Sequence, residues 1–308
     1  MKKVFIDGSA GTTGLRIAER LASRPDLLLL RLPDDRRKDP EARRECLNQA
    51  DVAFLCLPDA AAVEAVALVE NPDTVIIDTS TAHRTAPGWT YGLPELEGQR
   101  EKIRLSRRVA NPGCHASGFI ALVAPLIRAG LVSPDAALTC FSLTGYSGGG
   151  KKMIAQYEAP DRDPLLEAPR QYGLTQQHKH LREMAVLCGL TVDPVFCPIV
   201  APFYSGMEVT VPLFREQLHG SAADIRALYA AAYGGPIVRY RADADEGGFY
   251  SAAAFSGRDD MEITVSGNDE RILLVARYDN LGKGASGAAI QTMNLLLGQN
   301  PTAGLVLN

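Results

Sequence analysis

Short apolar runs alternate with helical patterns along the first 80 residues of the chain. The apolar runs predict strands over Lys3–Ile6, Leu27–Leu32, Val52–Leu57 and Thr74–Asp78. The segments between them predict helices over Thr13–Ser23, Glu41–Asn48 and Ala60–Glu70. Strands that alternate with helices form a parallel sheet with helices on both faces. We therefore expect an α/β fold that begins with a Rossmann-type doubly wound parallel sheet.

The rest of the chain contains more strands with fewer helices between them. Apolar and polar residues alternate over Glu208–Leu213 and Glu262–Ser266, as they do in half-buried strands. Leu273–Tyr278 and, more weakly, Ile237–Tyr240 predict further strands. We expect a second, α+β domain with a mixed or antiparallel sheet.

Composition and charge exclude several classes of protein. The 308 residues suffice for about two domains, and 46% hydrophobic with 22% charged residues is ordinary for a folded protein. A net charge of −4 provides no basic field for a polyanion, so nucleic acid is not an expected partner. Apolar runs such as Phe119–Ile127 are too short to span a bilayer, and Val4–Ile6 is too short for a secretory signal. We expect a cytoplasmic protein without membrane contact.

Six cysteines are scattered along the chain without a CxxC pair. This spacing argues against a disulfide scaffold or a zinc site, and we expect no bound metal. We expect most of them to be small buried side chains, with Cys114 as the exception. The six are Cys46, Cys56, Cys114, Cys140, Cys188 and Cys197.

A glycine-rich turn joins the first expected strand to the first expected helix. Its glycines follow a GxxGxxG pattern. Glycine permits positive φ and close approach to a pyrophosphate, whose oxygens the first N–H groups of the helix can bind. Because the strand–turn–helix context is present, we predict a dinucleotide site here. The residues expected to bind the cofactor are Gly8, Ser9, Gly11, Thr12, Thr13 and Gly14.

The end of the second expected strand bears on the choice between NAD and NADP. A carboxylate at this place holds the ribose 2′-OH of NAD, whereas a cation suits the 2′-phosphate of NADP. Arg31 and the basic run Arg36–Lys38 stand here, although Asp34 and Asp35 lie between them. We predict NADP(H) as the cofactor, with Arg31 in contact with it.

A proline–glycine turn precedes one cysteine. Asn111-Pro112-Gly113-Cys114 leads into an apolar helical pattern from His115 to about Ala129. The turn places Cys114 at a helix N-terminus, where the pKa of a thiol falls and more thiolate forms. The same N–H groups can hold the oxyanion of a tetrahedral intermediate. From these residues alone, a nucleophile and a buried structural cysteine are equally open.

Four segments together resemble the N-acetyl-γ-glutamyl-phosphate reductase family. Ala110–Gly118 resembles its Asn-Pro-Gly-Cys signature, and Gly8–Gly14 resembles the loop of its shorter bacterial branch (type 2). Tyr91–Leu96 and Asp279–Gly287 are similar to two further landmarks of the family. The four segments extend from the first expected strand to the last expected helix.

The resemblance implies an NADPH-dependent reductase of arginine biosynthesis. Such an enzyme converts N-acetyl-L-glutamyl 5-phosphate to N-acetyl-L-glutamate 5-semialdehyde and phosphate, through a thioester that Cys114 would carry. It implies an NADP-binding domain over residues 1–113 and a substrate and dimerisation domain over residues 114–284. The last helix, Ala285–Leu297, would return to the first domain with residues 285–308. By analogy we expect a homodimer or homotetramer.

Thiol activation and collapse of the thiohemiacetal need an acid/base group that titrates near neutrality, which points to histidine. Gln177–Met184 resembles the family's His-x-His-x-x-Glu run. One of its two histidines is the expected acid/base, and the sequence does not separate them. We assign catalysis to His178 and substrate binding to His180.

An anionic substrate requires cations and close backbone approach. Arg84 follows the fourth expected strand, where open α/β sheets place ligand loops, and can hold the phosphate or the α-carboxylate. The run Ser147–Lys152 combines three glycines with a cation. Lys283 and Gly284 precede the last expected helix and are candidates for lining the nicotinamide site. The substrate contacts expected besides His180 are Arg84, Asn111, Gly149 and Lys151, and the further cofactor contacts are Ser80, Asn280 and Gly284.

Three positions depart from the family pattern. His115 stands where many relatives have tyrosine, His83 where many have phenylalanine, and Arg182 where a proline is common. These departures leave the reaction type unchanged but bring side-chain contacts and substrate preference into question.

Other functions fit parts of the sequence. Aspartate-semialdehyde dehydrogenase has the same type of fold and a cysteine nucleophile, and acts on a smaller substrate. Reductases of N-acetyl-aminoadipyl phosphate differ by one methylene, which is worth only about 1–3 kcal/mol in a pocket. A non-catalytic NADP-binding sensor would keep the glycine loop without needing Cys114. A cysteine–histidine hydrolase would need no glycine loop.

Overall fold

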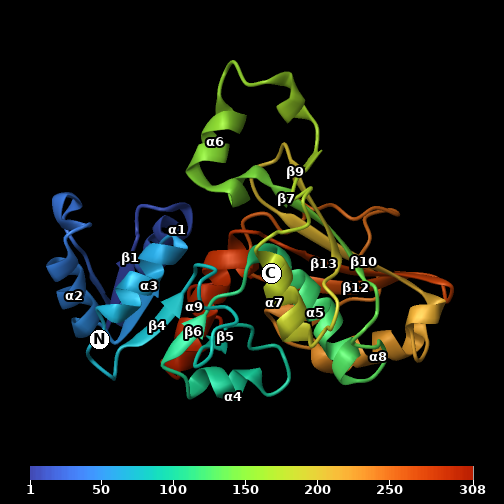
Figure 1. The fold of residues 1–308 in the computed structure, drawn as a ribbon, viewed down its shortest axis with the longest axis horizontal. Coiled ribbons are helices and arrows are strands. Elements are labelled where there is room, and N and C mark those ends of the chain that lie inside the picture. Colours follow the sequence, from blue (N-terminus) through green and yellow to red (C-terminus); the bar gives the residue numbers. More distant parts are fainter. Residues whose placement is uncertain (308) are drawn as a thin grey trace. The chain divides into compact units, whose positions relative to one another are not determined.

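The computed structural model describes residues 1–307, which divide into two compact units (Figure 1). The first unit comprises Met1–Pro94, Gly98–Pro112 and Ala285–Leu305. The second comprises Glu95–Glu97, Gly113–Gly284 and Val306–Asn308. The functional domains expected over residues 1–113, 114–284 and 285–308 stay a prediction, because compactness does not show what each part binds.

A six-stranded parallel sheet forms the centre of the first unit, in the order β2-β1-β3-β4-β6-β5. The chain leaves β1 toward β2 on one side and crosses to β3 on the other. In such sheets, ligands bind at this switch point, outside the carboxyl ends of the strands. The strands are β1 (Lys2–Asp7), β2 (Leu27–Leu30), β3 (Val52–Leu55), β4 (Val75–Asp78), β5 (Thr90–Tyr91) and β6 (Arg108–Ala110).

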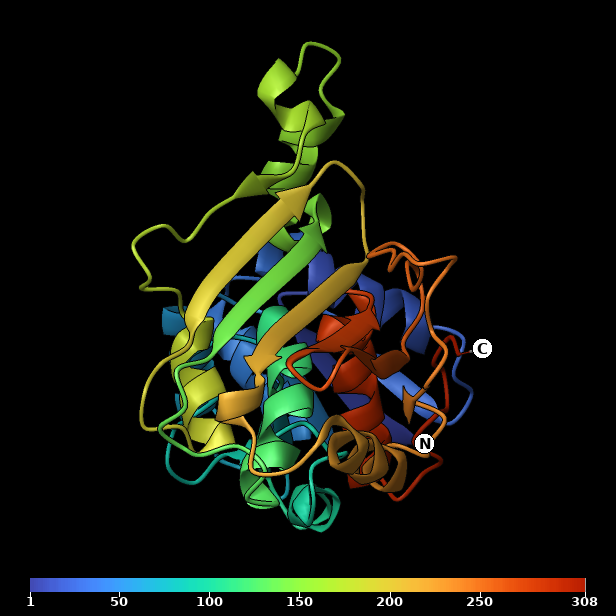
Figure 2. The same cartoon turned by 90° about the vertical axis from the view of Figure 1, so that its right-hand side faces the viewer.

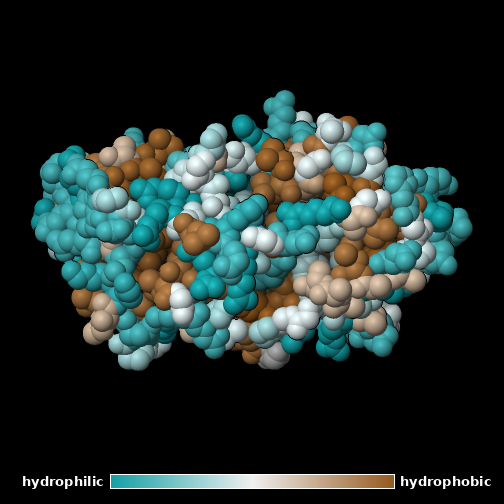
Figure 3. Space-filling view, turned by 90° about the horizontal axis from the view of Figure 1, so that it is seen from below, coloured by the Kyte–Doolittle hydropathy of each residue, from teal (hydrophilic) through white to brown (hydrophobic). Residues whose placement is uncertain are grey.

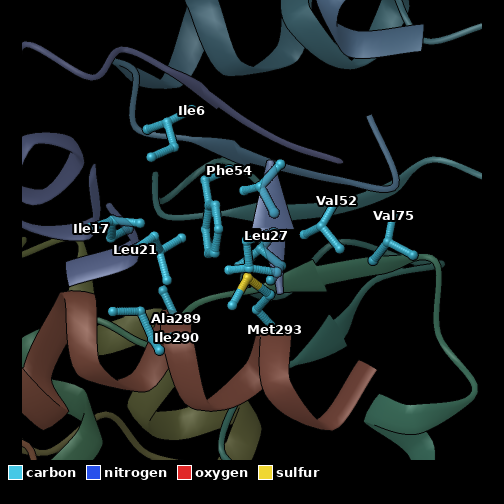
Figure 4. Close-up of a cluster of buried hydrophobic side chains, with 12 residues drawn as sticks. Ile6, Ile17, Leu21, Leu27, Val52, Phe54, Val75, Ala289, Ile290 and Met293 are labelled. Atoms are coloured by element: carbon cyan, nitrogen blue, oxygen red, sulfur yellow. The ribbon is translucent and has the colours of Figure 1, made fainter. Parts of the chain in front are cut away.

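Helices cover both faces of this sheet. Side chains of α1 and α9, among them Ile17, Leu21 and Met293, pack on one face with Val52 and Phe54 (Figure 4). Helices α2 and α3 supply the core of the opposite face. The doubly wound α/β fold predicted from the sequence is therefore confirmed. The helices are α1 (Thr12–Leu21), α2 (Pro40–Gln49), α3 (Asp59–Ala67), α4 (Gln99–Arg104) and α9 (Gly287–Leu296), with the short turn η1 (Asp34–Arg36).

Some predicted element ends are wrong. β2 ends at Leu30 instead of Leu32, and β3 ends at Leu55 instead of Leu57. Both apolar runs continue past their strands, since they lead into the prolines that begin the next turn. The last helix was expected from Ala285, but a π-helical turn over Gly282–Ser286 (η5) comes first and α9 begins at Gly287.

A seven-stranded mixed sheet forms the second unit, in the order β11-β12-β13-β10-β7-β9-β8. The pairs β11–β12 and β7–β9 are parallel and the other pairs are antiparallel, which confirms the mixed sheet. The strands are β7 (Thr139–Gly145), β8 (Arg170–Gln171), β9 (Val195–Ala201), β10 (Met207–Phe214), β11 (Val238–Tyr240), β12 (Met261–Gly267) and β13 (Arg271–Tyr278). The helices are α5 (Cys114–Arg128), α6 (Gly150–Glu158), α7 (His180–Cys188) and α8 (Ala222–Ala232), with the short turns η2 (Tyr146–Gly149), η3 (Pro164–Glu167) and η4 (Arg215–Gln217).

The two faces of the mixed sheet are covered differently. Helices α5 and α8 pack on one face, and α7 packs against α5. On the opposite face, no helix of the described residues 1–307 covers β7, β9 and β10 (Figure 2). Phe141, Val195 and Phe214 are 45%, 54% and 61% exposed on these strands. We call this surface over β7, β9 and β10 the open face.

Beside the open face, the segment that follows β11 covers β12 and β13. Arg277 of β13 is buried there, donates to the carbonyl oxygen of Ala244, and forms ion pairs with Glu246 and Glu262. The covered part therefore carries charge, whereas the open face exposes apolar side chains.

Polar side chains cover much of the surface shown in Figure 3, with apolar patches between them. Within residues 1–307, none of the helices is both long and apolar enough to cross a bilayer. The expectation that most cysteines are buried is wrong. Cys140 and Cys188 are buried, whereas Cys46 in α2, Cys56 after β3 and Cys197 on the open face are partly exposed.

Candidate active site

Two glycines of the loop after β1 are required by packing. Gly8 has φ +85°, and a Cβ there would lie 2.3 Å from the carbonyl oxygen of Cys56. A Cβ on Gly14 would lie 2.5 Å from the carbonyl oxygen of Gly8. Any larger residue would push the loop off β3 or helix α1 off the loop, so the tight turn depends on both glycines.

The N-terminus of α1 fits a phosphate group. Gly11 is the N-cap and supplies no side-chain hydrogen bond, and the first turn contains no acidic residue. The first N–H groups of a helix have no partner within the helix and attract anions. The hydroxyl-bearing residues Ser9, Thr12 and Thr13 are all partly exposed around this end. The loop thus has both the cradle and the donors that a dinucleotide pyrophosphate needs.

A buried carboxylate precedes this loop. Asp7 is 3% exposed at the end of β1, and Arg43 of α2 holds it through two nitrogens at 2.9–3.3 Å. Burial raises the pKa of Asp7, and the Arg43 guanidinium opposes this rise. The ion pair also compensates a negative charge that would repel a phosphate on the adjacent loop.

The structure separates the cations that follow β2. Arg36 pairs with Asp39, and Arg37 pairs with Asp34. Arg31 is exposed and has no carboxylate partner among residues 1–307. Asp34 is therefore occupied by Arg37, which leaves Arg31 and Lys38 as the cations of this segment available to a 2′-phosphate.

We predict that Arg31→Ala raises the KM for NADPH by about 10- to 100-fold, since one guanidinium–phosphate contact is lost. The KM for NADH should stay within about twofold of the wild type. Steady-state kinetics with both cofactors measure the ratio. Arg37→Ala is the matched control, because that arginine is paired with Asp34. An unchanged NADPH to NADH preference in Arg31→Ala would contradict the assignment.

The carboxyl ends of β4 and β6 place three more of the expected site residues. Ser80 donates through its amide and its hydroxyl to the buried carboxylate of Asp78. Arg84 donates to the carbonyl oxygens of Asn111 and Thr79, at 3.1 and 3.4 Å. The first unit therefore brings Ser80, Arg84 and Asn111 to one sheet edge.

Asn111 offers a buried acceptor. Its side chain is 1% exposed, and its Nδ2 donates to the carbonyl oxygen of Ala285 at 3.1 Å. Its Oδ1 has no hydrogen-bond partner among residues 1–307. An unsatisfied buried acceptor is costly, so this atom is a candidate contact for a bound donor.

Cys114 is the first residue of α5, with Gly113 as the N-cap. The amide of Gly113 donates to Glu183 Oε2 at 3.2 Å, and Tyr278 donates to the carbonyl oxygen of Cys114 at 2.5 Å. A Cβ on Gly284 would lie 3.1 Å from the Cβ of Cys114. The thiol is therefore held at a helix N-terminus, against a glycine that leaves room beside it.

The two histidines near the start of α7 lie close to each other. The rings of His178 and His180 are 4.7 Å apart, and His180 is only 4% exposed. Nε2 of His180 lies 3.8 Å from Oε1 of Glu183, whose other oxygen accepts from Gly113. One carboxylate thus joins the turn before Cys114 to one histidine, and that histidine is His180.

His115 is buried beside the two histidines. Its ring centroid lies 5.4 Å from that of His180 and 6.0 Å from that of His178. Burial, followed by the positive charges of His178 and Lys179, lowers the pKa of His115 to about 3. The imidazole is therefore neutral at every pH where the protein is expected to work.

His115 should make the fold sensitive to acid. Its pKa is about 3 when folded and about 6.5 when unfolded, so between these values the unfolded chain binds more protons. Its stabilising contribution is complete above pH 6.5 and is lost as the pH falls toward 3, by up to about 1.4 kcal/mol per pH unit. Urea unfolding between pH 4 and 7 measures the slope. His115→Gln should have a shallower slope, and an equal slope would contradict the prediction.

The glycine run after β7 forms the turn η2 and the start of helix α6. Gly149 is the N-cap of α6, and Lys151 is exposed in the first turn of that helix. The side chain of Asn280 donates to Ser147 Oγ and accepts from the amide of Gly206, both at 3.0 Å. Asn280 therefore anchors this run to the end of β13, and its side chain is already engaged in that contact.

Lys283 forms a buried ion pair, and its expected place at the nicotinamide site stays a prediction. It is 0% exposed, and its Nζ lies 2.9 Å from both carboxylate oxygens of Glu95. Burial lowers the pKa of Lys283, and Glu95 opposes this. The two segments that carry Glu95 and Lys283 are both family landmarks in the sequence, and this ion pair joins them.

Two residues of the cysteine site were not assigned from the sequence. Glu183 stands three residues after His180, and this spacing on one helix face was a signal for a pair. Tyr172 lies 2.7 Å from Nε2 of His115. No local pattern marks Tyr172, because the contact depends on the pairing of β8 with β9.

Comparisons with known proteins match both parts of the chain. A family model described as the NAD binding domain of semialdehyde dehydrogenase matches residues 3–106, and one described as its dimerisation domain matches residues 114–280. Among solved structures, aspartate semialdehyde dehydrogenase II from Vibrio cholerae, complexed with ASA, has a TM-score of 0.72 at 16% identity over 97% of this chain and 98% of that one. The enzyme with NADP from Candida albicans has a TM-score of 0.67 at 14% identity, covering 98% and 99%. At these identities the likeness shows the fold.

Curated relatives are more similar. N-acetyl-gamma-glutamyl-phosphate reductase 2 of Pseudomonas putida is 45% identical over 309 residues, covering 96% of each chain. N-acetyl-gamma-glutamyl-phosphate reductase of Brucella ovis is 46% identical over 307 residues, covering 96% of this chain and 99% of the relative. The chain belongs to the N-acetyl-γ-glutamyl-phosphate reductase family.

Proposed function

We propose that this protein reduces N-acetyl-L-glutamyl 5-phosphate to N-acetyl-L-glutamate 5-semialdehyde and phosphate with NADPH, as a step of arginine biosynthesis. The observation that carries the proposal is Cys114 at the N-terminus of α5, with Glu183 bridging its turn to His180. The relatives that share 45–46% of the sequence support this substrate over the smaller aspartate semialdehyde. A non-catalytic sensor or a hydrolase would not need the cysteine site and the dinucleotide loop together.

The first unit supplies the residues that hold the cofactor. The N–H groups at the start of α1 would bind the pyrophosphate, and Arg31 would bind the 2′-phosphate. Ser80, at the end of β4, would also contact the cofactor. When bound, NADPH supplies a hydride to the carbonyl carbon of the substrate. Asn280 and Gly284 of the second unit stay as predicted cofactor contacts, Asn280 through its backbone, since its side chain binds Ser147 and Gly206.

The acyl transfer step belongs to Cys114. Its thiolate attacks the carbonyl carbon, the carbon–phosphate oxygen bond breaks, and phosphate leaves with the electron pair, so a thioester remains. After hydride addition, the thiohemiacetal oxyanion expels the thiolate and the aldehyde is released. The N–H groups at the start of α5 stabilise the oxyanion in both steps.

The acid/base role, which the sequence placed on His178, is better assigned to His180. Glu183 lies 3.8 Å from Nε2 of His180 and stabilises the imidazolium that forms when the thiol loses its proton. His178 is more exposed, and its Nδ1 accepts from the amide of His180 at 3.2 Å. We therefore assign proton transfer to His180, and orientation of His180 together with substrate binding to His178.

Binding of the anionic substrate falls to cations and the buried amide. Arg84, held by two backbone carbonyl groups, would take the phosphate as a fork of donors. Lys151 in the first turn of α6 and the backbone of Gly149 would contact the carboxylate. Asn111 Oδ1 would accept from the N-acetyl amide, which is the hydrogen-bond donor of this substrate.

We also propose a cytoplasmic homodimer that forms through the open face and can assemble further into a tetramer. Phe141, Val195 and Phe214 expose apolar surface on three adjacent strands, and a two-fold interface can bury such a surface against itself. The matched dimerisation-domain model spans these strands.

The reaction run in reverse tests the function. N-acetylglutamate semialdehyde should reduce NADP only when phosphate is present, and aspartate semialdehyde should be turned over at least about 100-fold more slowly, because the site's acceptor for the N-acetyl amide is left unpaired. Equal turnover of both aldehydes would refute the acetylated substrate. NADP binding without turnover of either aldehyde would instead support the sensor.

A further inference from the structure

Arg43 of α2 uses only one edge of its guanidinium in the ion pair with Asp7. Nε lies 3.0 and 3.3 Å from the two carboxylate oxygens, and Nη2 donates to Oδ2 at 2.9 Å. The opposite edge consists of Nη1 and the second hydrogen of Nη2. This edge has no hydrogen-bond partner among residues 1–307, and Nη1 is not buried. We call it the free edge of Arg43.

The pair with Asp7 holds the free edge in a fixed direction. A guanidinium is planar, so hydrogen bonds from one edge to a carboxylate set the orientation of all five N–H groups. The side chains of Arg43 and Asp7 are only 12% and 4% exposed, so the surrounding chain restricts both. A donor that is already oriented loses little conformational entropy when it binds an anion.

The contact with Asp7 places Arg43 at the carboxyl end of β1. Asp7 is the last residue of that strand and directly precedes the glycine loop. Leu30, the last residue of β2, pairs with Phe5 of β1, so Arg31 leaves the sheet beside the same end. In doubly wound sheets, the end of the second strand faces the ribose 2′ position of a dinucleotide. Arg43 and Arg31 therefore lie at the edge of the sheet where this position is read.

The other arginine pairs that follow β2 do not hold a guanidinium in this way. Arg36 and Arg37 pair with Asp39 and Asp34, but their side chains are 51% and 44% exposed. Exposed ion pairs contribute little and are easily broken by solvent. Arg43 thus differs from these two arginines in having a buried carboxylate that directs it.

We propose that the free edge of Arg43 binds the 2′-phosphate of the cofactor, which makes Arg43 a specificity-determining residue for NADPH over NADH. Parallel N–H groups match two oxygens of a phosphate, whereas the ribose 2′-OH of NADH offers one uncharged oxygen. Asp7 is the positioning residue, because it fixes the direction of the free edge. The inference rests on the proposed function only in taking NADP(H) as the cofactor.

Isothermal titration calorimetry with 2′,5′-ADP and 5′-AMP tests the contact without turnover. The two probes differ only in the 2′-phosphate, so the ratio of their dissociation constants measures the binding of that group. Arg43→Lys is the main variant, because lysine keeps a positive charge beside Asp7 but has no second edge. We expect it to weaken binding of 2′,5′-ADP by about 10- to 100-fold and to leave that of 5′-AMP within about twofold.

A double variant tests the same contact without the buried charges. Asp7→Asn combined with Arg43→Met removes the ion pair as a unit, so neither charge is left without its partner. It should lose the preference for 2′,5′-ADP as Arg43→Lys does. Urea unfolding of both variants separates a lost contact from a lost fold.

Arg44→Lys is the matched control. It makes the same change one residue along α2, on an arginine that donates to Glu70 at 2.8 Å, and its ratio should equal that of the wild type. A wild-type ratio in Arg43→Lys would overturn the inference and leave NADP(H) standing as the cofactor. An equal loss for both probes would also overturn it, because the contact would then lie on another part of the nucleotide.

Two further outcomes separate the inference from the proposed function. Equal binding of the two probes by the wild type would refute NADP(H) as the cofactor, and the inference with it. The expected loss in Arg43→Lys, in a protein that turns over neither aldehyde, would refute the proposed reduction and support the contact of Arg43 with the 2′-phosphate.

Discussion

Cys114→Ala should lower kcat for reductive dephosphorylation by about 10⁴-fold or more, because no thioester can form without the nucleophile. The affinity for NADPH should be unchanged, since the glycine loop that binds it is built on β1 and α1. Intact-mass spectrometry measures the cause directly. Wild-type protein mixed with the acyl phosphate, in the absence of cofactor, should gain the mass of one N-acetylglutamyl group and release one phosphate.

The control for this experiment is Cys46→Ala, which removes a partly exposed cysteine of the first unit. That variant should keep wild-type turnover and the mass increase. Retention of activity in Cys114→Ala, or a mass increase that persists without Cys114, would contradict covalent catalysis at this residue.

Glu95→Gln should destabilise the protein by about 3–5 kcal/mol, the usual effect of removing one charge of a buried ion pair. The ammonium of Lys283 is 0% exposed, and the substitution replaces the carboxylate that holds it with a neutral amide. Denaturant unfolding near pH 7 measures the change. Because burial lowers the pKa of Lys283, the loss should shrink as rising pH removes the lysine's proton.

Two comparisons test the cause of that loss. Glu101→Gln breaks the exposed pair of Arg104 and Glu101, whose side chains are 52% and 66% exposed, and should change stability by less than about 1 kcal/mol. Lys283→Met combined with Glu95→Gln should recover most of the stability, since an apolar side chain has no charge to compensate. A double variant as unstable as Glu95→Gln would show that the charge was not the cause.

The parts of the fold that depend on local signals were predictable. The glycine loop, the first four strands of the first unit and the turn before Cys114 each follow from residue types within a short segment, whereas β5 and β6 were not predicted. Helix α6 was not predicted because three consecutive glycines, Gly148–Gly150, are typical of a loop. In the structure, Gly149 is the N-cap of that helix. Strand β7 was missed because its exposed residues, such as Phe141, are apolar and hide the alternation of a half-buried strand.

Candidate site residues could be named from the sequence as far as their chemistry lay in one motif. Cys114, His178 and His180 could be named from their runs, and these residues do lie around one helix N-terminus in the second unit. The proposed choice of which histidine transfers the proton and which binds substrate depends on which of them lies against Glu183. The contact of Tyr172 with His115 joins residues that are 57 positions apart, and only the sheet brings them together.

The sheet of the first unit also has a consequence for synthesis of the chain. Its strands come from the first 110 residues, but Ala289, Ile290 and Met293 of α9 complete the core between them and α1. At about 5–20 residues per second, a ribosome needs roughly 10–35 s to translate residues 113–284 before α9 can emerge. During this time the nascent first unit exposes an apolar surface on Val4, Ile17 and Phe54. We therefore expect the growing chain to depend on a holding chaperone until its last helix leaves the exit tunnel.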